Sequence, residues 1–183
     1  MGDGTSSDEI ERALKGVHRF RGVYSSNDMP NPLTVPADSC LIANYGKTSQ
    51  PGTHWIAILH LNDVSQPPAY FDPFGFSPDD LNQLIHQDAH FKSYMDKAAK
   101  RFHGRYATND FNLQGATTDD CGEYCVYAVL VNRLPLDSNG KVDPRWRQII
   151  DHVNGSSANH DRRLMSLVKI RGPVPRVPKA YPS

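Results

Sequence analysis

The chain has 183 residues, of which 38% are hydrophobic and 22% are charged, and its formal net charge is zero. This length and composition predict a soluble globular protein with a single domain over residues 1–170. The balanced charge gives no overall electrostatic case for binding nucleic acid, and no apolar stretch approaches the roughly 18–20 residues of a membrane span.

Residues 171–183 are predicted to form a flexible tail, because they are rich in proline and basic side chains. The sequence has three cysteines, an odd number without the spacing of a disulfide framework, which indicates a reducing compartment. The N-terminal residues lack the apolar core of a signal peptide, so we expect translation into the cytosol and no secretion.

The first half of the sequence predicts one helix followed by three strands. Ser6 and Glu9 form a capping-box pattern at the start of a helix that continues to about Lys15. Residues 21–36 contain three prolines and many small polar side chains, so this stretch is predicted to be a loop. Three runs rich in apolar residues are then predicted as strands, at positions 40–45, 53–61 and 69–72.

The strand at 53–61 is apolar on both faces, which is typical of a strand covered on both sides. Residues 69–72 are predicted to pair with it as a hairpin. A turn centred near Asp63 places His54 opposite Asp72, close enough for a hydrogen bond between the imidazole and the carboxylate. Pro67 and Pro68 leave this register open.

The second half of the sequence is predicted to be mainly helical. Ser77 and Pro78 form a strong helix start, with a serine N-cap and a proline in the first turn. Residues 111–114 are predicted as a short strand that ends at Gln114. Further helices are predicted at four places, 91–101, 124–131, 143–155 and 164–170.

Cys121 stands in a polar stretch, between Asp120 and Gly122, immediately before the apolar run predicted as the central helix. At a helix start, unpaired backbone N–H groups and the positive end of the helix dipole favour thiolate over thiol. Most lone cysteines are small buried hydrophobic residues, and Cys125, one helical turn onward, is the competing candidate. Because Cys125 lies inside the apolar run, burial is expected to keep it a thiol, and we predict Cys121 to be the nucleophile.

His54 and Asp72 are predicted to complete a catalytic triad with Cys121. His54 is expected to take the thiol proton, and Asp72 to hold the imidazole in the required tautomer and stabilise the imidazolium. Most histidines are surface or structural residues, so the case for His54 rests on its place in a strand beside Trp55. The alternative for Asp72 is that Asp72 and Pro73 only open a turn.

Gln114 lies seven residues before Cys121 and is predicted to donate its amide to an oxyanion, together with the Cys121 N–H. Trp55 and Gly122 are expected to support the substrate cleft, since glycine lets a substrate carbonyl approach the backbone closely. The three cysteines lack the paired Cys and His spacings of a zinc site, so we predict no metal.

These segments resemble those of the adenovirus protease (adenain) family, in the superfamily that includes the SUMO-specific proteases. Residues 52–57 resemble the family's Gly-x-His-Trp strand. Residues 70–77 are similar to its acidic-Pro-Phe-Gly-Phe-Ser segment, with aspartate where the adenoviral enzymes commonly carry glutamate. Residues 113–115 and 121–125 resemble its Gln-Gly and Cys-Gly-x-x-Cys elements, and weaker similarity extends over roughly the first 130 residues.

The resemblance implies an α+β fold, with a central mixed β-sheet flanked by helices and the nucleophile cysteine at the N-terminus of a buried central helix. It implies a cysteine endopeptidase that cleaves viral precursor proteins during virion maturation, through His54, Asp72 and Cys121, with Gln114 at the oxyanion. Its substrates are then polypeptides cut after small residues such as glycine. We expect a monomer located in the virion and in the host nucleus or cytoplasm.

The chemistry of this family requires no cofactor, but its members carry two activators, viral DNA and a disulfide-linked peptide from another virion protein. Residues 102–111, which precede Gln114, contain no cysteine, and the neutral net charge does not support a DNA activator. We therefore expect any activating peptide to bind without a disulfide.

Three other interpretations remain open. The same site serves ubiquitin- or SUMO-like isopeptidases. The same triad also serves some acetyltransferases, although the sequence offers no basic pocket for coenzyme A. A non-catalytic virion-associated binding protein is the third, and the presence of all four active-site residue types speaks against it.

Overall fold

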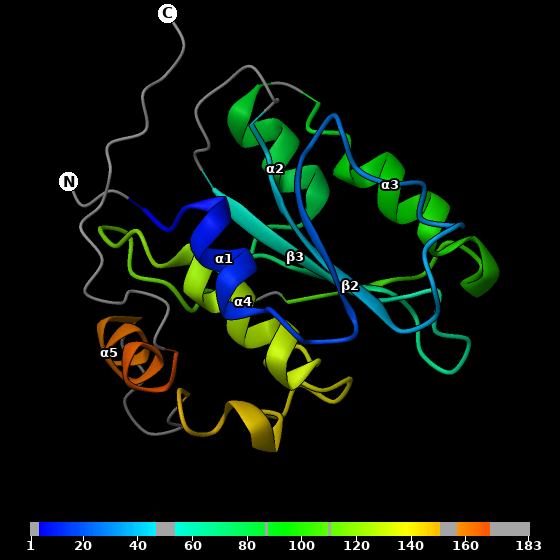
Figure 1. Cartoon of the computed structure of the whole chain (residues 1–183). Coiled ribbons are helices and arrows are strands. Elements are labelled where there is room, and N and C mark those ends of the chain that lie inside the picture. Colours follow the sequence, from blue (N-terminus) through cyan, green and yellow to red (C-terminus); the bar gives the residue numbers. More distant parts are fainter. Residues whose placement is uncertain (1–3, 47–53, 87, 110, 151–156, 169–183) are drawn as a thin grey trace, which may run out of the picture.

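The computed structural model describes residues 4–46, 54–86, 88–109, 111–150 and 157–168. In these ranges, a five-stranded mixed β-sheet lies between two layers of helices (Figure 1). The α+β class and the central mixed sheet predicted above are confirmed. The boundary expected at residue 170 and the tail at 171–183 lie outside the described residues.

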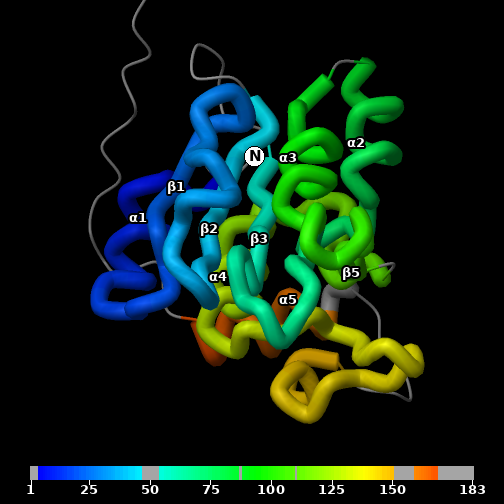
Figure 2. The backbone as a smooth tube through the Cα atoms, turned by 90° about the vertical axis from the view of Figure 1, so that its right-hand side faces the viewer, coloured from blue at the N-terminus to red at the C-terminus, as the bar shows by residue number. Residues whose placement is uncertain are grey.

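The strands follow one another across the sheet in chain order. They are β1 (Phe20–Ser25), β2 (Ser39–Asn44), β3 (Trp55–Leu61), β4 (Ala69–Phe71) and β5 (Ala107–Thr108). β1 pairs parallel with β2, β3 runs antiparallel to both β2 and β4, and β5 is parallel to β4. Figure 2 shows β1, β2 and β3 side by side.

Helices cover both faces of the sheet (Figure 1). One layer contains α1 (Ser7–Ala13), α4 (Cys121–Val131) and α5 (Ser157–Leu167), and the other contains α2 (Pro78–Ile85) and α3 (Phe91–Ala98). Two short 3₁₀ helices, η1 (Lys100–Phe102) and η2 (Pro144–Trp146), complete the elements of the described ranges. Each layer buries its own apolar cluster against the sheet, so β2, β3 and β4 are covered on both sides, as expected for β3.

The helix starts follow the capping patterns read from the sequence. Ser6 caps α1 and Ser77 caps α2, each in a complete capping box with the acid three residues later. Such boxes satisfy backbone N–H groups that have no acceptor inside the helix, which fixes where the helix begins.

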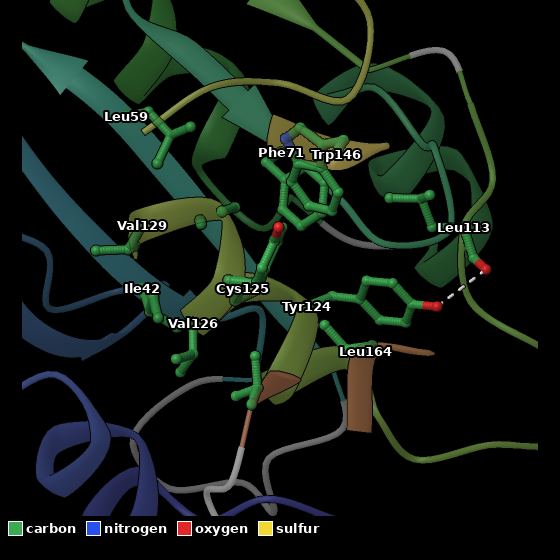
Figure 3. Packing of buried hydrophobic residues seen from close by; sticks show 14 of the residues in the cluster. Ile42, Leu59, Phe71, Leu113, Tyr124, Cys125, Val126, Val129, Trp146 and Leu164 are labelled. Carbon is green, nitrogen blue, oxygen red and sulfur yellow. Dashed lines mark hydrogen bonds between the residues drawn. The ribbon is translucent and has the colours of Figure 1, made fainter. Parts of the chain in front are cut away.

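α4 is the buried central helix, and its position decides the geometry of the site. Its side chains pack against the sheet and against Trp146, as Figure 3 shows around Cys125 and Tyr124. Burial raises the pKa of the Cys125 thiol well above its usual range and that of Cys40 to about 12. Both thiols are therefore protonated at neutral pH, as predicted for Cys125.

The structure contradicts two loop and strand predictions. Residues 20–25 form β1, although 21–36 was predicted to be a loop, because the three prolines of this stretch all follow the strand. Residues 111–114 do not form a strand. The N–H groups of Leu113 and Gln114 both donate to the Pro73 carbonyl, at 2.9 and 3.1 Å, an arrangement that a regular β-ladder does not contain.

Two predicted helices differ as well. Asp143 opens only η2, and the N–H groups of Ile149 and Ile150 then share the carbonyl of the fully buried Trp146. Packing of this indole overrides the helical periodicity, and Val153 lies outside the described residues. The last helix, α5, begins at residue 157 and not at residue 164.

Candidate active site

His54 and Asp72 meet at one end of the β3–β4 pair. His54 immediately precedes β3 and Asp72 immediately follows β4, and His54 Nε2 lies 2.8 Å from Asp72 Oδ1. The imidazole and the carboxylate are 4% and 0% exposed. The hydrogen bond expected from the sequence is therefore present, in a site closed to bulk water.

The register of this pair differs from the predicted one. Ala57 pairs with Phe71, so the connection is centred one position later than Asp63. Asp72 is consequently a diagonal neighbour of His54 across the ladder and does not face it directly. Diagonal neighbours on one face of a sheet are within reach of long side chains, which explains how the contact survives the shift.

Asn109 holds the backbone of Asp72 on both sides. Its Oδ1 accepts the Asp72 N–H at 2.9 Å, and its Nδ2 donates to the Asp72 carbonyl at 2.6 Å. Asp72 Oδ1 also accepts the N–H of Phe74 at 2.8 Å. Because its main chain and its carboxylate are both hydrogen-bonded, Asp72 has little freedom to move away from the imidazole.

The turn after Asp72 connects it to Gln114 through Pro73 and Gly75. The Pro73 carbonyl accepts the N–H groups of Leu113 and Gln114, so the strand end that carries the acid also fixes the backbone of the amide. Gly75 has a φ of +78°, and a Cβ at this position would approach the Phe111 carbonyl carbon to 2.9 Å. Glycine is required here because the two segments cross in close contact.

Cys121 is the first residue of α4, with Asp120 as the N-cap. Its side chain is 8% exposed and lies close enough to His54 to contribute to the raised pKa of the imidazole. The first N–H groups of a helix have no acceptor within it, so the positive end of the α4 dipole is directed at this sulfur.

The electrostatics of His54 favour the imidazolium. Burial alone lowers the pKa of the ring, but the charge and hydrogen bond of Asp72, with a smaller contribution from Cys121, outweigh burial and raise the pKa to about 10. The arrangement can therefore hold a proton on His54 at neutral pH.

Gln114 is 1% exposed and lies in the loop before α4. Its Nε2 donates to the Thr118 carbonyl at 2.6 Å, which fixes the orientation of the amide, since a carbonyl accepts only from the nitrogen side. The amide nitrogen carries a second N–H that this bond does not use. Gln114 is thus an oriented donor with one hydrogen left for another acceptor.

Thr5, a residue with no predicted role, contacts both Trp55 and Gly122. The indole Nε1 of Trp55 donates to the Thr5 carbonyl at 2.8 Å, and the Thr5 hydroxyl donates to the fully buried Glu123. A Cβ on Gly122 would meet the Thr5 Cβ at 2.6 Å. The structure shows Thr5 packed against this glycine, and the expected support of the substrate cleft by Trp55 and Gly122 stays a prediction.

A cluster with metal-ligand chemistry lies at the opposite end of β3. Oxygen and nitrogen atoms of Asp38, His60 and Asp63 lie within 4.8 Å of one another. Arg19 Nε lies 3.9 Å from Asp38, and burial together with the charge of Arg133 lowers the pKa of His60. Two guanidinium groups thus already accompany these acids, which disfavours a divalent cation at this place.

Comparison with known proteins agrees with this geometry. A sequence model described as "Adenovirus endoprotease" matches residues 20–166. The chain belongs to the adenovirus endoprotease family. A protein named "Protease" from Porcine adenovirus A serotype 3 is 26% identical over 158 residues, which cover 83% of this chain and 74% of that protein. The chain is thus a viral cysteine protease, a hydrolase that acts on polypeptides.

Two residues that contact the site had no signal in the sequence. Thr5 and Asn109 act through tertiary hydrogen bonds, and neither lies in a motif or a periodic pattern. Gly52 and Thr53, part of the motif around His54, lie outside the described residues. Within the described ranges, every helix is too short or too polar to span a bilayer.

Proposed function

We propose that this protease is an endopeptidase that cleaves viral precursor polypeptides during virion maturation, with Cys121 as nucleophile, His54 as general base and acid, and Asp72 as the group that orients the base. The observation that carries the proposal is the position of the imidazole, which is hydrogen-bonded to the Asp72 carboxylate at 2.8 Å and interacts with Cys121 at the start of α4. An acid, a base and a thiol in this order support nucleophilic acyl transfer.

In the first step, His54 takes the thiol proton and the Cys121 sulfur attacks the carbonyl carbon of the scissile peptide bond. A C–S bond forms, and the carbonyl electron pair becomes an oxyanion. The free N–H of Gln114 and the backbone N–H of Cys121 are the donors proposed to stabilise it. The imidazolium then gives its proton to the leaving nitrogen as the C–N bond breaks, and a thioester remains on Cys121.

In the second step, water attacks the thioester while His54 accepts a proton from it. The C–S bond breaks, the carboxylic acid product leaves, and the sulfur departs as thiolate beside the imidazolium. Asp72 favours both steps because its carboxylate stabilises the charged ring. The raised pKa of His54 is consistent with this stabilisation of the charged ring.

Access to the sulfur constrains the substrate. With Cys121 8% exposed and His54 4% exposed, only a narrow, extended chain reaches the thiol. Small residues at the cleaved bond satisfy this requirement, which supports cleavage after glycine. The same constraint applies to a ubiquitin-like tail, so the experiment below includes that substrate.

The test is cleavage of purified adenoviral precursor polypeptides by the recombinant chain, with product masses read by mass spectrometry. We expect discrete internal cuts, and none with Cys121→Ala. A fluorogenic ubiquitin-tail substrate is the second arm. Cleavage of that substrate alone, with the precursors left intact, would replace the proposal with an isopeptidase function.

We further propose that any activating peptide binds without a disulfide. All three cysteines are buried, with Cys40 and Cys125 at 0% exposure, and residues 102–111 carry no thiol. A covalent tether would therefore have to form at the nucleophile or inside the core. Non-covalent addition to a sheet edge avoids both.

A further inference from the structure

Asp161 of α5 binds the loop that contains Gln114. Its Oδ2 accepts the N–H of Gly115 at 3.1 Å and lies 3.2 Å from the hydroxyl of Thr118, while its Oδ1 accepts the hydroxyl of Tyr124 at 2.6 Å. The residue is 6% exposed. A carboxylate so deeply placed is stable only with several donors, and this one gathers them from the loop and from α4.

The neighbouring contacts extend this anchor. Burial and the Asp161 carboxylate raise the pKa of Tyr124, so its hydroxyl remains a donor. The hydroxyl oxygen also lies 3.2 Å from the carbonyl of Leu113 (Figure 3), and His160 Nδ1 lies 3.3 Å from the same carbonyl. Two consecutive residues of α5 therefore contact the residues on either side of Gln114.

Hydrogen bonds within the loop connect Gln114 and Gly115 to Thr118. The Thr118 N–H donates to the Gly115 carbonyl at 3.2 Å, and the Gln114 side chain donates to the Thr118 carbonyl. The direction of the Gln114 amide thus depends on where Thr118 is held. Asp161 Oδ2 accepts the N–H of Gly115 at one end of this turn and lies 3.2 Å from the Thr118 hydroxyl at the other, where the Gly115 carbonyl, at 3.0 Å, is a second acceptor for the same hydroxyl.

We propose that Asp161 is a positioning residue that sets the direction of the Gln114 amide toward the oxyanion; this inference rests on the proposed function. Asp161 touches neither the thiol nor the imidazole in any contact described above. Its effect should appear in steps that develop charge on the substrate oxygen. Reactions of Cys121 that need no oxyanion should be unaffected.

The decisive variants are Asp161→Leu and Asp161→Asn. Leucine removes every acceptor. Asparagine keeps one oxygen for Gly115 and Thr118 and presents its NH₂ to Tyr124, whose hydroxyl then donates to the Leu113 carbonyl. We expect Asp161→Leu to lower kcat by about 10- to 100-fold, an effect no larger than that of removing an oxyanion donor outright. Asp161→Asn should retain most of the wild-type kcat.

Two further readouts separate positioning from general stability. A peptide aldehyde forms an adduct whose oxygen occupies the oxyanion position, whereas iodoacetamide alkylates the thiol by displacement. Asp161→Leu should weaken the aldehyde by a factor similar to its loss in kcat and leave the alkylation rate of Cys121 unchanged. In a double variant with Gln114→Ala, the Asp161→Leu change should lower kcat little beyond the loss that Gln114→Ala causes alone.

Unchanged kcat in Asp161→Leu, or alkylation that falls in parallel with kcat, would overturn the inference. If Asp161→Leu does not fold, Gly115→Ala replaces it, since the added Cβ would approach Asp161 Oδ2 to 2.8 Å and displace the carboxylate. If the wild type cleaves no peptide, the proposed endopeptidase function fails. The aldehyde and alkylation measurements still decide the role of Asp161.

Discussion

The rings of His54 and Phe74 stack, with centroids 4.9 Å apart and planes inclined by 25°. The N–H of Phe74 is also a donor to the carboxylate of Asp72 that binds the imidazole. A single turn after β4 thus supplies the acid, a partner for that acid and an aromatic surface for the ring. An aromatic face attracts a cation, so this stacking favours the imidazolium.

We predict that Cys121 is the thiol that reacts at neutral pH. Iodoacetamide should label it selectively, because Cys40 and Cys125 are fully buried and their pKa values are raised. Cys121→Ala should abolish hydrolysis, and Cys125→Ala is the matched control that should stay active. Peptide mapping after labelling identifies the site, and an active Cys121→Ala variant would refute the assignment.

We predict that Asp72 sets the alkaline limit of activity. Because the pKa of His54 is raised to about 10, the imidazolium that protonates the leaving nitrogen should persist until the pH approaches that value. Asp72→Asn removes the main raising contribution, so the alkaline fall of kcat/KM should move to lower pH and the rate should drop roughly 10²- to 10⁴-fold. Asp72→Glu should be partly tolerated.

A pH–rate profile of the three proteins checks this prediction. The apparent pKa values belong to the coupled thiol and imidazole, so the informative quantity is the displacement between variants. An Asp72→Asn profile that superimposes on the wild type after scaling would show that Asp72 does not act on the imidazole.

We predict that Asn109 is needed to hold Asp72. Asn109→Leu leaves the Asp72 N–H and carbonyl without their side-chain partners, and each buried unsatisfied group costs roughly 1–3 kcal/mol of folding stability. Thermal melting should detect this loss, and kcat should fall at temperatures where the variant is still folded. The kcat of Asn109→Asp should also fall, since this variant loses the amide donor and adds a negative charge beside Asp72. Wild-type kcat in both variants would contradict the prediction.

We predict that Gly122 and Thr5 are coupled. Gly122→Ala should reduce stability and activity, because its methyl group would meet the Thr5 Cβ at 2.6 Å. Thr5→Gly removes the obstacle, so the double variant should recover part of the loss seen in Gly122→Ala. A double-mutant cycle on melting temperature and kcat measures the coupling, and strictly additive effects would exclude the contact as the cause.

We predict that activation survives removal of the other two thiols. A Cys40→Ser, Cys125→Ala double variant should respond to an activating peptide as the wild type does, with reductant present to keep Cys121 reduced. Intact mass spectrometry should find no mixed disulfide with the peptide. A required disulfide at Cys40 or Cys125 would overturn the non-covalent proposal.

The fold was predictable where the pattern is local. Capping boxes located α1 and α2, and continuous apolar runs located β2, β3 and α4. β1 was missed because its hydrogen bonds come from parallel pairing with β2, which no local pattern reports. The helix expected after Asp143 was lost to the packing of Trp146, a tertiary effect.

The site was predictable where residue chemistry is distinctive. A thiol at a helix start, a histidine at the start of an apolar strand and an acid at a strand end form a combination that few other functions require. The supports are different. Asn109 and Asp161 are ordinary polar residues until the fold places them beside Asp72 and Gly115. Their roles depend on distances that only the folded chain defines.

The contact between Gly115 and Asp161 also has a consequence for the time at which the protease becomes active. During translation, the residues of the strands, the nucleophile and the base are synthesised before residue 161. Until then, the loop with Gln114 lacks the carboxylate that anchors it. Because a domain generally folds as a unit, the site should become competent only once α5 has been synthesised and packs against α4. Synthesis itself would thereby delay the onset of proteolysis.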